Sequence, residues 1–383
     1  MTGMAMNENE YDARLCIAAS EHDADMYYGT GFLVPDACIF FEKNGRKYLV
    51  LTDLELERGK QDARVDEILA FAAYRERLEK QGCSSPKLID VANCVLRDYQ
   101  IRRVAVPGNF ALQYADGLRE RGYAVHVQEP FWEARMQKTA AEIAAIQQTQ
   151  QANEQALDAA IQVIRASEIG ADQELYYQGR RLTAEFVQRQ IQLALFERDC
   201  LAQGTIVSCG DQATRPHERG AGPLRAHQAI IIDIFPQSLT SRYFGDLTRT
   251  IVKGRASAAL KRMYAVVQAG QELACHAIRA GVNGRDVHRQ VQDLFAKEGY
   301  ETGLLNGTMQ GFFHGTGHGV GLEIHEAPRL GQVDATLQAG NVVTVEPGLY
   351  YIGIGGVRLE DLVVVTANGC TNLTTYPKEL EVA

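Results

Sequence analysis

The chain has 383 residues, 46 % of them hydrophobic, so we expect two domains with sizeable cores. Its 39 basic and 48 acidic side chains give a net charge of −9, which argues against a nucleic-acid-binding protein. No run of about 18 apolar residues is present, so we expect no membrane-spanning helix. The polar, acidic residues 1–14 predict no signal peptide, and eight scattered cysteines without a C-x-x-C pair indicate reduced thiols and a cytoplasmic protein.

The first part of the chain, up to residue 135, alternates short strand-like and helix-like segments. The dipeptide Asn44-Gly45 between two apolar runs predicts a β-hairpin. The segments that we expect are strands at 37–41, 47–52, 103–107 and 123–127 and a helix at 112–121. This pattern indicates an α/β domain, and it contains neither a phosphate-binding loop nor a cluster of metal ligands.

A domain boundary is expected near residue 136. Thr139-Ala140-Ala141-Glu142 matches a capping box, which marks the start of a helix, and the helix should run to about Ser167. The predicted domains are therefore residues 1–135 and 136–383.

The second part mixes helices and strands. Apolar residues at helical spacing predict helices around 187–195, 260–267 and 287–295, and the strand-like runs are 229–235, 243–252, 341–346 and 357–365. Two of these strand pairs carry carboxylates, which hints at a duplicated half-domain. Coincidence explains the same pattern equally well.

Three of the nine histidines, His314, His318 and His325, fall within twelve positions. Imidazole is the commonest neutral metal ligand and the usual acid or base near pH 7. Four glycines in residues 315–321 argue against an ordinary core strand and allow close approach of backbone, metal and substrate. This segment therefore has the composition of a chemical site.

Asp233 and Asp246 are the first pair of strand carboxylates. Twelve residues separate them, which lets them lie directly opposite each other on one face of a simple hairpin. Opposed carboxylates repel unless cations bridge them. The alternative is that Asp246 caps a turn or pairs with Arg249.

Glu346 and Glu360 form the second pair. Alone, Glu360 is as easily a solvated edge residue beside Arg358. Together with a glycine-embedded histidine, four strand carboxylates suit a hard or borderline ion, Mn²⁺ above all, with Co²⁺ or Zn²⁺ as alternatives. Two such ions about 3.5–4 Å apart, sharing carboxylates, form a two-metal hydrolase site.

At these residues the chain resembles the pita-bread metallopeptidases, within them the proline-specific branch of Xaa-Pro aminopeptidase and Xaa-Pro dipeptidase. The resemblance covers 136–383 strongly, and 15–135 are similar to the creatinase-type N-terminal domain. The implied fold class is α+β, a pita-bread catalytic domain preceded by a smaller α/β domain. The motifs are Asp233, Asp246-Leu247-Thr248-Arg249-Thr250, residues 314–326, Thr344-Val345-Glu346-Pro347-Gly348-Leu349-Tyr350 and Gly356-Val357-Arg358-Leu359-Glu360-Asp361.

The resemblance implies a role for each matching residue. Two divalent ions would be held by Asp233, Asp246, His318, Glu346 and Glu360, with Asp246 and Glu360 bridging them. Glu346 would also move a proton. Of the catalytic histidines, His217 would be an outer active-site histidine, and His325 would hydrogen-bond the substrate or the tetrahedral intermediate. His314 and Arg358 would contact substrate, although Arg358 is equally placed to pair with Asp361. His22, His126, His227, His276 and His288 have no motif context, and we assign them no role.

The implied function is metal-dependent hydrolysis of the Xaa-Pro bond at the N-terminus of peptides or dipeptides by a homodimer. The alternatives are a non-catalytic peptide-binding relative or a metal-free creatinase-type hydrolase, both disfavoured by the intact ligand set. A methionine aminopeptidase is disfavoured by the N-terminal domain and His314. Two departures from the family pattern are a loop two residues longer between Asp233 and Asp246, and a charged block at 211–219 that leaves residue preference open.

Overall fold

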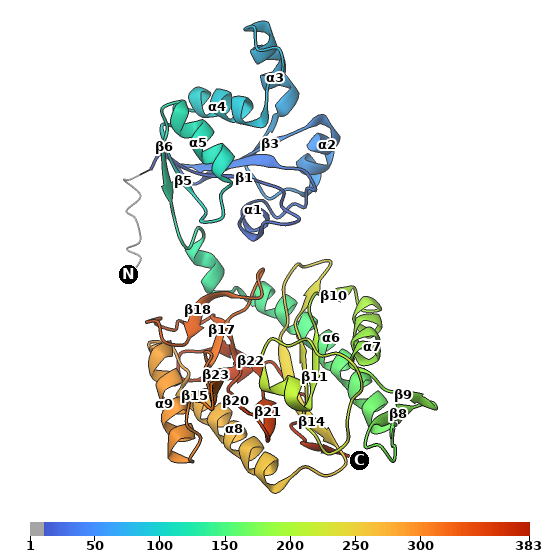
Figure 1. The fold of residues 1–383 in the computed structure, drawn as a ribbon. Helices are drawn as coiled ribbons and strands as arrows, with labels where there is room; N and C mark the ends of the chain where they lie inside the picture. Colours follow the sequence, from blue (N-terminus) through green and yellow to red (C-terminus); the bar gives the residue numbers. More distant parts are fainter. Residues whose placement is uncertain (1–10) are drawn as a thin grey trace. The chain divides into compact units, whose positions relative to one another are not determined.

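The computed structural model describes residues 11–383, and the chain divides into two compact units between Arg135 and Met136. The prediction of no signal peptide was made from residues 1–14. Of these, residues 1–10 lie outside the described residues. Figure 1 draws both units, and each is described by itself below.

The first unit is built on one six-stranded mixed sheet in the order β4-β3-β2-β1-β5-β6. Asn44 and Gly45 have φ values of 51° and 73°, as a two-residue hairpin turn requires, and they join β2 to β3 as predicted. The strands are β1 (Ala13–Ala18), β2 (Cys38–Lys43), β3 (Arg46–Leu51), β4 (Glu67–Ala70), β5 (Arg103–Val106) and β6 (Ala124–Val127). The helices are α1 (Ala24–Thr30), α2 (Asp53–Asp62), α3 (Phe71–Lys80), α4 (Leu88–Asp98) and α5 (Leu112–Glu120), and the short 3₁₀ helix η1 (Glu133–Met136) follows.

The second unit contains two larger sheets, in the orders β11-β12-β14-β24 and β18-β17-β19-β22-β23. Their strands are β11 (Ile206–Cys209), β12 (Ile230–Ile234), β14 (Leu247–Lys253), β24 (Glu381–Val382), β17 (Gly317–Gly319), β18 (Glu326–Leu330), β19 (Val342–Val345), β22 (Asp361–Val365) and β23 (Cys370–Asn372). Shorter ladders are β7 (Glu168–Ile169) with β8 (Leu175–Tyr177) and β9 (Arg180–Arg181), β10 (Cys200–Ala202) with β13 (Pro236–Ser238), β15 (Gly303–Leu305) with β16 (Thr308–Gln310), and β20 (Gly348–Tyr351) with β21 (Gly355–Arg358).

Each large sheet packs against two helices. Helices α6 (Ala140–Arg165) and α7 (Ala184–Phe196) share an apolar core with β12 and β14, whereas α8 (Ala258–Ala277) and α9 (Gly284–Lys297) share one with β19 and β22. Helix α6 begins with the predicted capping box, since Thr139 Oγ1 accepts from Glu142 N at 3.3 Å and Glu142 Oε2 accepts from Thr139 N at 2.8 Å. Each of the two carboxylate-bearing strand pairs thus belongs to a sheet that packs against two helices (Figure 1).

Two strand predictions were wrong in detail. Residues 357–365 form two strands, β21 and β22, because the chain breaks at Leu359-Glu360, and the run 243–252 becomes a strand only at Leu247. The glycine-rich segment also contains a strand, β17, inside the five-stranded sheet.

The glycines of β17 permit that placement. A Cβ on Gly317 would lie 1.9 Å from the carbonyl oxygen of Thr344, and one on Gly319 would lie 2.4 Å from that of Ala327. Side chains at these positions would push β17 away from its neighbours, so glycine density here marks close backbone approach.

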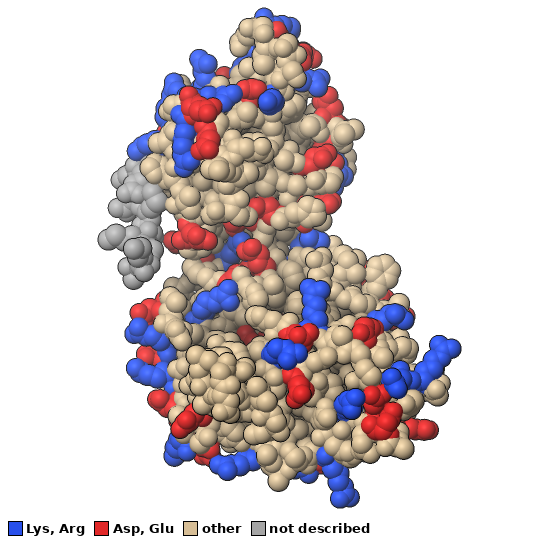
Figure 2. All heavy atoms as spheres, viewed as in Figure 1, with Lys and Arg blue, Asp and Glu red and all other residues tan. Residues whose placement is uncertain are grey.

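The described helices include none that is both long and apolar enough to cross a bilayer. On the face drawn in Figure 2, basic and acidic side chains are interspersed rather than gathered into a large patch of one sign.

Candidate metal centre

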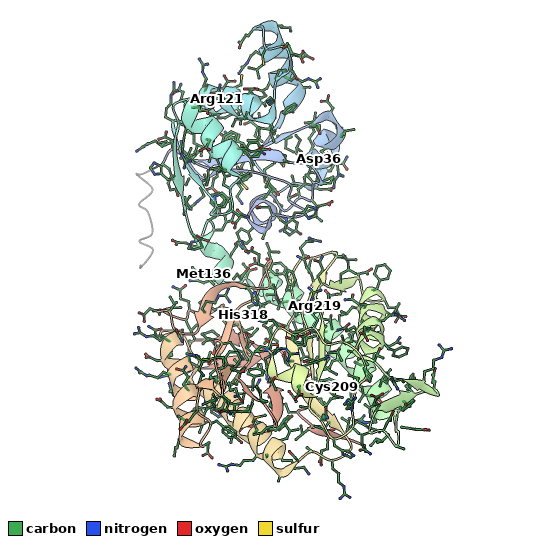
Figure 3. All side chains as sticks on the ribbon, in the orientation of Figure 1. Asp36, Arg121, Met136, Cys209, Arg219 and His318 are labelled. Atoms are coloured by element: carbon green, nitrogen blue, oxygen red, sulfur yellow. The ribbon has the colours of Figure 1, made fainter. Side chains whose placement is uncertain are left out.

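The five predicted ligands all line one pocket of about 830 Å³ in the second unit. Each comes from a strand or the end of one: Asp233 from β12, Asp246 from the residue before β14, His318 from β17, Glu346 from the residue after β19, and Glu360 from the break between β21 and β22. Figure 3 labels His318, which lies within the second unit. Residues more than 120 positions apart in sequence are thereby brought to one pocket.

The register between β12 and β14 differs from the prediction of directly opposed aspartates. Asp233 lies opposite Thr248, and Ile234 lies opposite Leu247, so Asp246 is displaced from Asp233 by two positions. The displacement keeps both carboxylates on one face but avoids direct opposition of like charges. The reason is the tip of the hairpin, where Ser238 N donates to Tyr243 O at 3.0 Å and closes a loop over 239–242.

The longer loop between the aspartates makes a ladder of its own. Pro236–Ser238 forms β13, which pairs with β10, and Leu239 N donates to Asp199 O at 2.8 Å. The extra residues thus bind to a neighbouring hairpin and leave the aspartates on the same face.

Asp246 and Glu360 are almost completely buried, at 4 % and 2 % exposure, and their ligand atoms lie within 4.8 Å of each other and of a nitrogen of His318. Burial, together with the neighbouring carboxylates, raises the pKa of both acids well above the usual range. Thr248 Oγ1 donates to Glu360 Oε2 at 2.7 Å, and Gln150 of α6 holds the backbone of Asp246 through two 2.9 Å hydrogen bonds.

His318 is oriented to offer Nε2 as a ligand. Its Nδ1 faces the carbonyl oxygen of Gly319 at 3.1 Å, so the tautomer that satisfies this contact leaves the Nε2 lone pair free. Nε2 lies 3.6 Å from Asp246 Oδ2 and 3.3 Å from Glu346 Oε1. Burial lowers the pKa of His318 to about 3, so the ring is neutral, the form that binds metal.

Glu346 faces the pocket beside this group. Its Oε1 accepts from Thr344 Oγ1 at 3.2 Å, and Thr344 Oγ1 also accepts from His318 N at 3.0 Å. Burial raises the pKa of Glu346 to about 7. Without a bound metal ion, this carboxyl group exchanges a proton closer to neutral pH than an ordinary glutamate does.

Asp233 differs from the other four predicted ligands because it forms an ion pair with an arginine. Its Oδ2 accepts a 2.6 Å hydrogen bond from Arg358 Nη2, and Arg358 Nη1 donates to the hydroxyl of Tyr350 at 2.9 Å. That hydroxyl is 2.9 Å from His314 Nε2, so a continuous polar chain runs from Asp233 to His314. The alternative partner for Arg358 is not used, because Asp361 pairs with Arg249 at 2.8 Å and with Lys378 at 2.6 Å.

The charge of the cluster tests whether metal ions fit it. Four carboxylates and a neutral His318 line the pocket, and Arg358 is the one Lys or Arg side chain paired with any of these carboxylates among residues 11–383. Buried carboxylates without counter-charges are costly, and Asp246, Glu346 and Glu360 have none of their own. Oxygen donors with one imidazole suit a hard or borderline divalent cation.

The walls of the pocket carry the other predicted residues. His217, His314 and His325 line it, and the His325 ring meets the His318 ring edge-on at 4.4 Å. Burial and the charge of Arg358 lower the pKa of His314 to about 3. The apolar side chains of the lining include Ile206, Phe235, Phe313, Ile324 and Val333, and Arg219 and Arg329 line the pocket beside Arg358.

Sequence reasoning gave no role to four residues of this site. Gln150 supports Asp246, Thr248 supports Glu360, and Tyr350 links Arg358 to His314. His288, which had no motif context, lines the pocket with its Nδ1 2.9 Å from Thr316 Oγ1. Thr248 and Tyr350 lie inside quoted motifs and were detectable there, whereas Gln150 and His288 sit on helices with no local signal.

A pocket with a buried, oxygen-rich cation site and proton-exchanging side chains defines a metal-dependent hydrolytic enzyme. The comparison with known proteins specifies the family. Residues 144–367, more than half of the chain, match Metallopeptidase family M24, and the chain belongs to that family. Divalent metal ions and peptide substrates follow from this membership.

Individual relatives agree over most of the chain. An Xaa-Pro dipeptidase of Pyrococcus furiosus is 26 % identical over 98 % of this chain and 97 % of its own. Xaa-Pro aminopeptidase 1 of Streptomyces coelicolor is 32 % identical over 63 % of this chain and 52 % of its own. The structure of an Xaa-Pro dipeptidase from Bacillus anthracis superposes with a TM-score of 0.83 and 25 % identity, covering 99 % of this chain and 97 % of its own.

These matches confirm the predicted fold class and the resemblance to the proline-specific pita-bread metallopeptidases. They lend no support to a non-catalytic relative.

Proposed function

We propose that this protein is an exopeptidase that uses two divalent metal ions to hydrolyse the bond between an N-terminal residue and proline. The observation that carries the proposal is the buried group of Asp246, His318 and Glu360, with Glu346 beside it, in the lining of a pocket of about 830 Å³. The names of the relatives, which include dipeptidases and an aminopeptidase, support the same substrate class.

The five side chains that would hold the ions are Asp233, Asp246, His318, Glu346 and Glu360. When bound, such ions acidify a water and stabilise developing negative charge on the substrate. Mn²⁺ is the metal that we propose, with Co²⁺ or Zn²⁺ as alternatives.

The chain's own residues supply the proton chemistry. The leaving group is the proline nitrogen, which carries no amide hydrogen and must gain a proton when the bond breaks. Glu346, whose side chain lines the pocket beside His318, is placed to accept a proton from the attacking water and deliver it to that nitrogen. His325 and His217 would hydrogen-bond the substrate oxygen, and Arg358 and His314 would act on the substrate side of the pocket.

Arg329 supports a preference for short substrates. It lies opposite His318 in the β17–β18 ladder and lines the pocket, and its guanidinium has no ion-pair partner within residues 11–383. A guanidinium beside the metal ligands is positioned to pair with a substrate carboxylate. A dipeptide brings its C-terminal carboxylate to within one residue of the scissile bond, so we propose Arg329 as the residue that favours dipeptides.

The test uses the purified full chain with Mn²⁺ and compares Xaa-Pro with Xaa-Pro-Yaa-Zaa. Release of the first residue is expected from both, faster from the dipeptide, and Asp246→Asn or His318→Ala should reduce it by about 100-fold or more. Hydrolysis that continues at full rate in metal-stripped protein would refute the metal-dependent mechanism. A cytoplasmic location and a homodimer are further proposals from the sequence, and sedimentation analysis tests the second.

A further inference from the structure

A buried ion pair joins the segment before α6 to Glu326, the residue that follows His325 of the pocket lining. Lys138 lies just before α6, its side chain is 1 % exposed, and its Nζ lies 2.5 Å from Oε1 of Glu326, whose side chain is 8 % exposed. The partners are 188 positions apart in sequence. Removing two charges from water is costly, so such a pair contributes less to stability than to fixing one geometry.

The lysine is held in place by its backbone and neighbours. Lys138 N donates to Gly340 O at 2.8 Å, and Asn341 Nδ2 donates to Met136 O at 2.8 Å. Gln137 adds a hydrogen bond to Gln338. The segment 136–138 is therefore attached to the turn that leads into β19, and Lys138 reaches Glu326 from a fixed base.

Glu326 closes the loop that joins β17 to β18. It pairs with Gly319 where the register shifts after His318, and its Oε2 accepts from Glu323 N at 3.4 Å. The carboxylate also lies over Gly321, since a Cβ there would be 2.4 Å from Glu326 Oε1. The Glu326 carboxylate thus lies against loop 320–325 at two positions, Gly321 and Glu323.

His325 is the last residue of this loop and depends on it. Its ring lines the pocket and packs edge-on against His318, but within the described part of the chain no hydrogen bond holds the ring. The backbone of loop 320–325 therefore sets where the imidazole stands.

We propose that the Lys138–Glu326 pair positions His325: the ion pair fixes loop 320–325 so that the ring stands on the substrate side of His318. Lys138 and Glu326 are positioning residues, and neither need touch the substrate. This inference rests on the proposed peptidase function and extends it to a residue outside every motif that marks the site.

The test is a double-mutant cycle in the Mn²⁺-loaded full chain, with hydrolysis of an Xaa-Pro dipeptide and bound metal as readouts. Lys138→Met should lower kcat/KM by about 10–100-fold, as loss of a supporting group does, with bound Mn²⁺ retained. In a His325→Ala background the same substitution should change kcat/KM by less than about twofold, because the ring that it positions is already gone. A merely structural role would instead give additive losses.

Gly321→Ala makes the same test without changing charge, because the new methyl group displaces the Glu326 carboxylate. It decides the outcome if Lys138→Met does not fold. The matched controls are Lys261→Met, which breaks an exposed pair with Glu381, and Gly369→Ala, whose new Cβ meets nothing within 4 Å; both should retain wild-type activity.

Three results would overturn the inference: additive losses in the cycle, full activity of Lys138→Met, or full activity of His325→Ala. Failure of the proposed function is distinguishable, since the wild-type chain would then release no residue from the dipeptide with Mn²⁺ bound.

Discussion

Replacing Glu346 by glutamine should stabilise the metal-free protein while abolishing its activity. Burial raises the pKa of Glu346 from 4.5 to about 7, so ionising it costs more in the folded chain than in the unfolded chain. This cost is absent below pH 4.5, where both states are protonated, grows between pH 4.5 and 7, and is complete above pH 7. The shift corresponds to about 3 kcal/mol at pH 8.

Urea unfolding of wild type and Glu346→Gln in EDTA, at pH 4 and pH 8, measures the effect. His314 and His318 also contribute to the pH dependence of the free energy of unfolding, because their lowered pKa values favour folding as pH rises. Both proteins contain these histidines, so the difference between the two proteins cancels that contribution. The variant should be more stable at pH 8 by up to about 3 kcal/mol and much less so at pH 4. With saturating Mn²⁺ the order should reverse at pH 8, because wild type binds metal more tightly.

The exposed Glu272 on α8 is the control, since Glu272→Gln should leave the pH dependence unchanged. A Glu346→Gln protein that is less stable than wild type at pH 8 without metal would refute the reasoning. A difference that does not vary with pH would do the same.

Gln150→Leu removes two hydrogen bonds to the backbone of Asp246 and should weaken Mn²⁺ binding by about 10–100-fold, as measured by metal titration; unchanged affinity would contradict this support role. Arg329→Gln should slow hydrolysis of an Xaa-Pro dipeptide about tenfold or more but leave its C-terminal amide nearly unaffected, and equal losses on both peptides would remove the carboxylate role. Gly317→Ala should lower the free energy of unfolding by about 3 kcal/mol because the new Cβ would overlap the carbonyl oxygen of Thr344, and a melting temperature equal to wild type would show that β17 can move.

Local patterns in the sequence predicted most of the fold. The Asn44-Gly45 turn and the capping box at Thr139 depend on neighbouring residues only, and both occur where expected. The split of 357–365 into two strands was not predictable, because an apolar run does not reveal that Glu360 is turned into a buried pocket. The glycines of residues 315–321 allow the close backbone approach that was predicted, but their density wrongly argued against a core strand at β17.

The proposed ligands were recognisable because their residue types lie in short motifs, but the residues that support them are distributed over the chain. The two-residue offset between Asp233 and Asp246 depends on hydrogen bonds at the tip of a hairpin, which spacing alone does not fix. Gln150 lies on a helix 96 positions before Asp246, and Lys138 precedes its partner by 188. Only tertiary structure brings such residues together.

The most direct test of the central claim is to titrate metal-stripped protein with Mn²⁺ and follow both bound ions and release of the first residue from Ala-Pro. We predict two ions per chain, hydrolysis that grows with occupancy, and loss of both in Asp246→Asn. Hydrolysis at full rate before any metal is added, or wild-type activity of Asp246→Asn, would contradict the account.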